Sequence, residues 1–217
     1  MKGKAVGADS RLTLLGGLIA VVTMTFTVIF ISACVIFYTI SPLRPLFVFH
    51  TAIPVPNTGY SIPDQYLSEL GVGPTAAMYN YGLMVTGLLA TAFFPLLYRL
   101  LEGSLAAKIS LVFGVGGSIS LIGVGVFPMH IPGPHGFFSA AFFTLIGLTI
   151  LFASYAMIGG RFFPRAISWL GVIVIVADVV LALLGNPASE WGTTILFIIW
   201  VYAVGITMIL KRNVTKI

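Results

Sequence analysis

The chain has 217 residues, of which 59% are apolar and only 8% carry a charged side chain. A soluble domain usually has about 25% charged residues, so this composition excludes an ordinary soluble protein and indicates an integral membrane protein. The formal net charge of +5 would suggest a nucleic-acid partner in a soluble protein, but here the position of the charges matters more than their sum. We therefore expect no nucleic-acid partner.

The apolar residues form six stretches, each about the 20 residues that a transmembrane helix needs. A helix satisfies the backbone groups of such a segment in lipid. We therefore predict an all-α polytopic membrane protein, a six-transmembrane-helix bundle that forms a single membrane domain over residues 1–217. The first stretch is about twice as long as the apolar region of a signal peptide, so we interpret it as a retained anchor. The predicted spans are 14–40, 76–101, 106–127, 135–158, 166–184 and 191–210.

Every lysine and arginine except Arg44 precedes the first span, flanks the second or fourth connection, or follows the last span. With six crossings, all these positions share one side of the membrane, and the positive-inside rule makes that side cytoplasmic. We expect a multi-pass protein of the cell membrane with both termini in the cytoplasm. All three histidines and four of the six acids fall at or near the opposite side.

The first outer connection, residues 41–75, is long and contains six prolines. A structureless connection of this length is uncommon, so we predict a cap or a functional loop that lies across the outer mouth of the bundle. Within it, residues 61–71 are predicted to form a short helix, with Ser61 as its N-cap, Asp64 in its first turn and Gly71 at its end.

Asp178 is the acid that lies deepest inside a predicted span. Counted from Arg165 at about 1.5 Å per residue, it lies about 20 Å from the cytoplasmic edge, in the outer half of the bilayer. An ionisable group at this depth faces protein or water and is a candidate functional residue. The structural alternative is an aspartate that joins helices through serine or threonine hydroxyl groups.

The three histidines are His50, His130 and His135. A neutral imidazole near carboxylates suits a metal ion or a general base, and His130, His135 and Asp64 are the candidate zinc ligands. A His-x4-His spacing across prolines matches no standard zinc signature, so no cofactor is assigned. A polar ligand pocket and histidines that only stabilise the membrane interface remain alternatives.

Three other residues are candidates for the same outer site. Glu69 lies late in the predicted loop helix, where the helix dipole disfavours an acid, so we expect a partner such as Asn80 or His135. Glu190, at the start of the sixth span, either faces this site or only complements the helix dipole. Trp200 lies deeper, where its indole N–H needs a partner, and it is expected to line the bundle interior.

Four short motifs occur in a fixed order: Ser68-Glu-Leu-Gly71, Tyr79-Asn-Tyr-Gly82, Gly125-Val-Phe-Pro128 followed by His135-Gly136, and Glu190 ten residues before Trp200. In this order they resemble the DUF998 family of small multi-helix membrane proteins, from about residue 65 to residue 210. The chain departs from the family pattern at Trp191, where a basic residue is favoured. The positions that the resemblance marks are Ser68, Glu69, Gly71, Asn80, Gly82, Gly125, Phe127, Pro128, His135, Gly136, Glu190 and Trp200.

These features together predict a protein that binds or handles a membrane lipid or similar amphipathic molecule in an outward-opening pocket. One alternative is a metal-dependent intramembrane hydrolase of lipid amides or esters, because the residue types resemble those of alkaline ceramidases and adiponectin-type receptors. This chain lacks their His-x3-His pair and one helix. Another is an accessory or assembly subunit whose outer cap binds a protein partner. The expected ligand-binding residues are Glu69, Asn80, His135, Glu190, Asp178 and Trp200, and the catalytic candidates are Asp178, Glu69 and His135.

Overall fold

The structure, a computed structural model, describes residues 9–48 and 51–212 of the chain. Within these ranges, six helices are long and apolar enough to cross a membrane, which confirms the predicted six-helix membrane bundle. The helices are α1 (Ser10–Ile40), α2 (Ala76–Tyr98), α3 (Leu105–Val126), α4 (Pro132–Gly159), α5 (Arg165–Leu184) and α6 (Pro187–Lys211).

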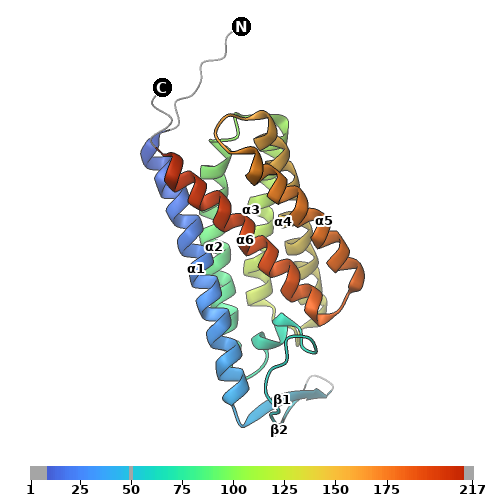
Figure 1. The fold of residues 1–217 in the computed structure, drawn as a ribbon. Coiled ribbons are helices and arrows are strands. Elements are labelled where there is room, and N and C mark those ends of the chain that lie inside the picture. Colours follow the sequence, from blue (N-terminus) through green and yellow to red (C-terminus); the bar gives the residue numbers. More distant parts are fainter. Residues whose placement is uncertain (1–8, 49–50, 213–217) are drawn as a thin grey trace.

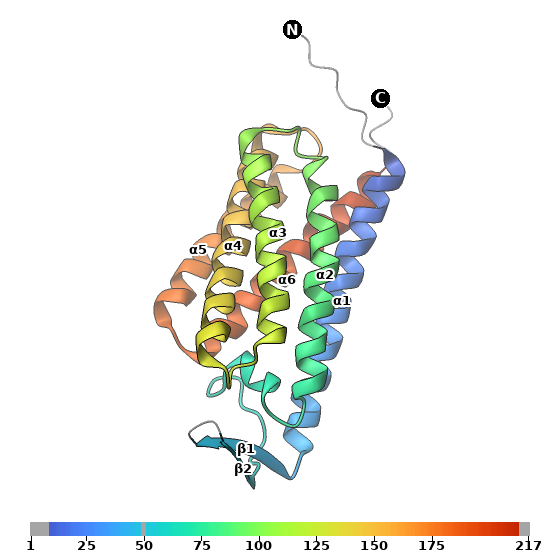
Figure 2. The same cartoon turned by 180° about the vertical axis from the view of Figure 1, so that it is seen from behind.

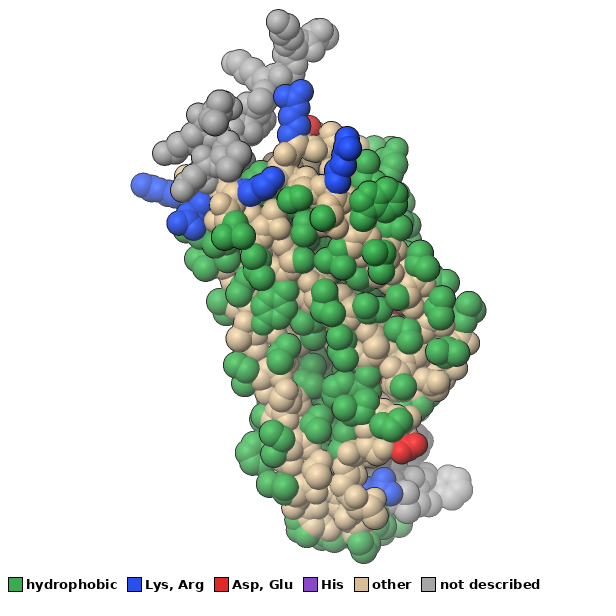
Figure 3. Space-filling view, in the orientation of Figure 1, with side chains coloured by type: hydrophobic (Ala, Val, Ile, Leu, Met, Phe, Trp, Pro, Cys, Tyr) green, Lys and Arg blue, Asp and Glu red, His purple; other side chains and the backbone are tan. Residues whose placement is uncertain are grey.

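The helices form a ring in which each packs mainly against its neighbours in the chain, and α6 closes the ring against α1 (Figures 1 and 2). The beginning of α1 and the end of α6 lie at the same end of the bundle, which we call the terminus end. The opposite end, which carries the long connection between α1 and α2, is called the cap end. On the face shown in Figure 3, lysine and arginine side chains gather at the terminus end, and the middle is largely apolar.

Small residues allow α3 to approach its neighbours closely. A Cβ added at Gly114 would lie 2.5 Å from the ring of Phe94 in α2, and one added at Gly117 would lie 2.7 Å from Ile146 in α4. Such close backbone approach is the usual basis of helix association in lipid, where hydrophobic burial gives no driving force.

Of the helices that begin at the cap end, α2 starts at Ala76 as predicted, whereas α4 and α6 start three and four residues earlier than predicted. Helix α6 starts at Pro187 because Asn186 and Ser189 cap it reciprocally: the backbone N–H of Ser189 donates to Asn186 Oδ1 (3.0 Å), and that of Asn186 donates to Ser189 Oγ (3.2 Å). A proline at the first helical position supports this start. Glu190 consequently lies in the first turn of α6.

The connection between α1 and α2 begins with an antiparallel hairpin of strands β1 (Leu43–Val48) and β2 (Thr51–Pro56). The hairpin projects beyond the end of α1, below the mouth of the bundle in Figures 1 and 2. Asn57 joins it to that helix, because its side-chain Nδ2 donates to the carbonyl oxygens of Tyr38 (2.5 Å) and Ser41 (3.0 Å).

The predicted loop helix over residues 61–71 is wrong in its first half. Ser61 and Asp64 form an isolated turn, closed by a 2.5 Å hydrogen bond from Ser61 Oγ to Asp64 Oδ2. Tyr66 then has an extended backbone, and only the 3₁₀ helix η1 (Leu67–Gly71) follows. Because η1 packs against α1, α2 and α6, it is the part of the loop that covers the mouth of the bundle.

Candidate functional site

Two cavities meet near the cap end. The cap cavity has a volume of about 390 Å³ and lies between α4, α5, α6 and the loop at η1. The core cavity has a volume of about 100 Å³ and lies deeper, between α1, α2, α3, α4 and α6. Ser139, Phe143 and Glu190 line both cavities, so these three residues mark the junction between them.

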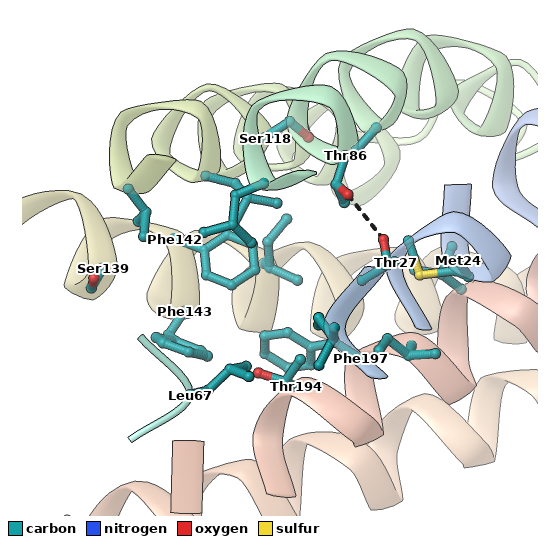
Figure 4. A pocket seen from close by; sticks show the side chains of 18 of the residues that line it. Met24, Thr27, Leu67, Thr86, Ser118, Ser139, Phe142, Phe143, Thr194 and Phe197 are labelled. Carbon is teal, nitrogen blue, oxygen red and sulfur yellow. Dashed lines mark hydrogen bonds between the residues drawn. The ribbon is translucent and has the colours of Figure 1, made fainter. Parts of the chain in front are cut away.

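The core cavity has largely apolar walls. Phe142, Phe143 and Phe197 surround it, as Figure 4 shows. Its few polar groups include Thr27 of α1 and Thr86 of α2, whose hydroxyl groups hydrogen-bond to each other at 3.0 Å. Because these hydroxyl groups already have hydrogen-bond partners within the protein, they do not require a polar ligand. The cavity is therefore suited to an apolar group.

Glu190 is the acid at the junction of the two cavities. Its Oε2 accepts long hydrogen bonds from the backbone N–H and the Oγ of Ser68, both at 3.5 Å, and the backbone N–H of Leu67 also points at the carboxyl group. These N–H groups belong to the start of η1, where backbone donors have no intrahelical partner. The η1 segment therefore positions Glu190 between the loop and the bundle.

His135 and Ser139 lie one helical turn apart in the first two turns of α4, facing the cap cavity. The Nδ1 of His135 is 2.9 Å from the carbonyl oxygen of Phe127, and its Nε2 is 3.4 Å from Ser139 Oγ. A carbonyl oxygen can only accept, so Nδ1 carries a proton. In the neutral imidazole Nε2 is then an acceptor for the serine hydroxyl.

Asp178 projects from α5 into the same cavity. Its Oδ1 accepts a 2.9 Å hydrogen bond from Thr193 Oγ1 of α6. Gly147 of α4 leaves room for the other oxygen, since an added Cβ there would lie 3.2 Å from Oδ2. The aspartate therefore joins α5 to α6 through a threonine hydroxyl group, which is the structural role considered as an alternative above. It also lines a cavity that residues of α4, α5 and α6 share.

Two residues expected at the site bind the loop instead. The carboxylate of Glu69 accepts from the backbone N–H of Tyr66 (3.0 Å) and from Gln65 Nε2 (3.1 Å), so it caps η1. The side chain of Asn80 donates to the carbonyl oxygen of Gly71 at 2.9 Å. The expected pairing of Glu69 with Asn80 or His135 is therefore wrong, because the shorter η1 places Glu69 in its first turn, where its own backbone offers donors.

Trp200 is fully buried, yet it lines neither cavity described above. Its indole packs beside Gly171 of α5, where an added Cβ would lie 2.8 Å from Trp200 Nε1 and 1.8 Å from Ser154 Oγ of α4. Within the described part of the chain, neither of these two polar atoms has a hydrogen-bond partner. Trp200 thus packs at a crossing of α4, α5 and α6 rather than at the site.

The metal candidates do not come together as a ligand set. Among residues 9–48 and 51–212, no group of three His, Cys, Asp or Glu side chains lies close enough to hold a metal ion. His130, His135 and Asp64 therefore form no such group. His50 lies outside the described residues.

Aromatic residues support the roof of the site. Tyr60 donates its hydroxyl to the carbonyl oxygen of Tyr66 (2.7 Å) and accepts from Trp191 Nε1 (3.2 Å). Its ring packs edge-on against Tyr38 of α1 and Trp191 of α6, with centroid distances of 5.4 and 6.0 Å. Burial raises the pKa of Tyr60 above its ordinary value. These contacts hold the loop between the two helices that close the ring.

The sequence had marked His135, Glu190 and Asp178, which all line the cap cavity, but had missed Ser139 and Thr193. A signal for both was present. Ser139 follows His135 by four residues and Thr193 follows Glu190 by three, so each lies on the same helix face as a residue already selected.

A family model described as "Protein of unknown function (DUF998)" matches residues 39–209. No match was found among curated proteins or solved structures. The matched range contains the loop, helices α2 to α5 and nearly all of α6, and therefore every residue that lines the cap cavity. The chain belongs to the DUF998 family, as the order of its short motifs had indicated.

Proposed function

We propose that this membrane protein binds a lipid or similar amphipathic molecule at its cap end. The polar part of the molecule lies in the cap cavity, and part of its apolar chain enters the core cavity. The observation that carries this proposal is the junction at Glu190, where a cavity with two carboxyl groups adjoins one with apolar walls.

The dimensions of the cavities are consistent with this role. The cap cavity, at about 390 Å³, falls in the usual range of small-molecule sites, about 300–1,000 Å³. The core cavity, at about 100 Å³, equals the liquid volume of about three water molecules. It therefore accepts a short stretch of a chain, and each buried methylene contributes about 0.8 kcal/mol.

We further propose that the cap end faces the outside of the cell membrane and that both termini are cytoplasmic. The support is the distribution of basic residues, which favours the terminus end as the cytoplasmic side. A cysteine introduced at the exposed residue Thr58 should react with a membrane-impermeant maleimide in intact cells. A cysteine in place of the exposed Ser104, in the α2–α3 connection, should not. The reverse result would invert the orientation.

Binding is tested by closing the junction with a bulky side chain. Ser139 lines both cavities, whereas the next residue, Ala140, is exposed on α4. After mild detergent extraction, mass spectrometry should detect an amphiphile bound to the wild type and to Ala140→Phe, but not to Ser139→Phe. Equal retention by both variants, or no amphiphile bound to the wild type at any added concentration, contradicts the proposal.

A second function, acyl hydrolysis or acyl transfer by a serine nucleophile, is favoured by the contact between His135 and Ser139. Many helical serine and threonine hydroxyl groups here donate to a carbonyl oxygen in the preceding turn, as Thr149 does to Leu145 and Ser118 does to Gly114. Ser139 instead contacts Nε2, the acceptor nitrogen of His135. A serine beside an oriented imidazole is the arrangement of an activated nucleophile. A fluorophosphonate probe should label the wild type but not Ser139→Ala; an unlabelled wild type excludes this function.

A further inference from the structure

We propose that the cap cavity selects amphiphiles with a cationic head group, an amine or a quaternary ammonium. This inference rests on the proposed function and adds the chemical class of the ligand. It follows from the charges that line the cavity, from how each carboxyl group is satisfied, and from the aromatic rings beside them.

The lining of the cap cavity contains two carboxyl groups, Asp178 and Glu190, and no lysine or arginine. The other titratable groups that line it are His135 and Tyr66. The imidazole of His135 donates Nδ1–H to a backbone carbonyl oxygen and contacts Ser139 through Nε2. An anionic head group in this cavity would therefore find no arginine or lysine to pair with, and it would lie beside two acids.

The protein satisfies these carboxyl groups only in part. Glu190 receives backbone donors from the start of η1, but Asp178 receives one hydroxyl group, that of Thr193, on Oδ1. No described residue donates a hydrogen bond to Asp178 Oδ2. Carboxyl groups inside a membrane bundle ordinarily pair with a cation or with several donors. A cationic head group would supply this missing partner.

Aromatic side chains favour the same class of ligand. The rings of Tyr66 and Phe143 line the cap cavity, and aromatic faces attract ammonium groups that have lost their water. Phe143 also lines the core cavity. A single-chain ammonium amphiphile can therefore place its head between the two acids and its chain past Phe143 into the bundle.

The test uses three probes with the same chain length and different heads: dodecyltrimethylammonium, dodecanol and laurate. Their affinities for the full-length protein in neutral detergent micelles are measured by native mass spectrometry. The ammonium probe should bind most tightly. Asp178→Asn and Glu190→Gln should each weaken it by about tenfold or more, while dodecanol binding stays unchanged. Glu102→Gln is the matched control, because Glu102 lies in the α2–α3 connection at the opposite end of the bundle.

The outcomes separate the two proposals. If dodecanol binds as tightly as the ammonium probe and neither acid variant affects either probe, the head-group selectivity is wrong while the amphiphile site stands. Tighter binding of laurate also overturns the selectivity. If none of the three probes binds the wild type, the proposed function fails as well. If Asp178→Asn does not fold, the affinity of Glu190→Gln for the ammonium probe alone tests the selectivity. This variant is expected to fold, because the backbone N–H groups of η1 that donate to Glu190 can also donate to an amide oxygen.

Discussion

Filling the core cavity should shorten the chain that the protein accepts without changing its preference among head groups. Ala90 of α2 lines this cavity and packs against the main hydrophobic core. Replacing it with leucine adds three carbon atoms. At about 30 Å³ each, comparable to the volume of a water molecule, they occupy most of the cavity volume of about 100 Å³.

The expected loss of affinity follows from the displaced methylene groups. A ligand chain that can no longer bury three methylenes loses about 0.8 kcal/mol for each, or about 2.4 kcal/mol in total. At 1.4 kcal/mol per tenfold change, the dissociation constant rises about 50-fold. The loss should appear only for chains long enough to reach the core cavity, and a shorter homologue with the same head group should bind as it does to the wild type.

The assay is native mass spectrometry with a series of alkyltrimethylammonium probes of increasing chain length. The matched control is Ala92→Leu, which adds the same three carbons two residues away, at an exposed position of the same helix. It should leave every affinity unchanged. An equal loss for short and long probes in Ala90→Leu would refute the reasoning, as would identical behaviour of the two variants, because either result removes the core cavity from the binding site.

Two further predictions concern stability. Gly171→Ala should lower the free energy of unfolding in detergent by about 1–3 kcal/mol through overpacking, because the added Cβ would lie 1.8 Å from Ser154 Oγ. The control is Gly136→Ala, whose added Cβ has nothing within 4 Å and should be neutral or slightly stabilising. Equal stabilities of these two glycine variants would contradict this prediction. Tyr60→Phe should lower the free energy of unfolding by about 1 kcal/mol through lost hydrogen bonds. Thermal unfolding of each variant beside the wild type measures these effects. Because the pKa of Tyr60 is raised in the folded state, its stabilising contribution is complete below about pH 10 and is lost as the pH rises further. The wild type should therefore lose more stability than Tyr60→Phe on alkaline titration, and parallel pH profiles would contradict this assignment.

The site was only partly predictable from the sequence. His135, Glu190 and Asp178 were found because each is an ionisable group at the end of a span or inside it, where such groups are costly in lipid. Glu69 was misjudged because its role depends on where η1 begins, and an extended residue at Tyr66 shortened that helix. Ser139 and Thr193 were missed because hydroxyl groups are common in membrane helices and acquire significance only from what they face.

The six membrane helices were predictable from the residues alone, because an apolar stretch of about 20 residues can satisfy its backbone groups in lipid only as a helix. The clustering of basic residues at one end of the bundle was predictable as well, since six crossings place the basic segments on the same side. Which polar residues meet, in contrast, depends on how the helices pack. The ring order brings α4, α5 and α6 around one cavity and leaves Glu69 and Asn80 in the loop, because side chains far apart in sequence become neighbours only through packing.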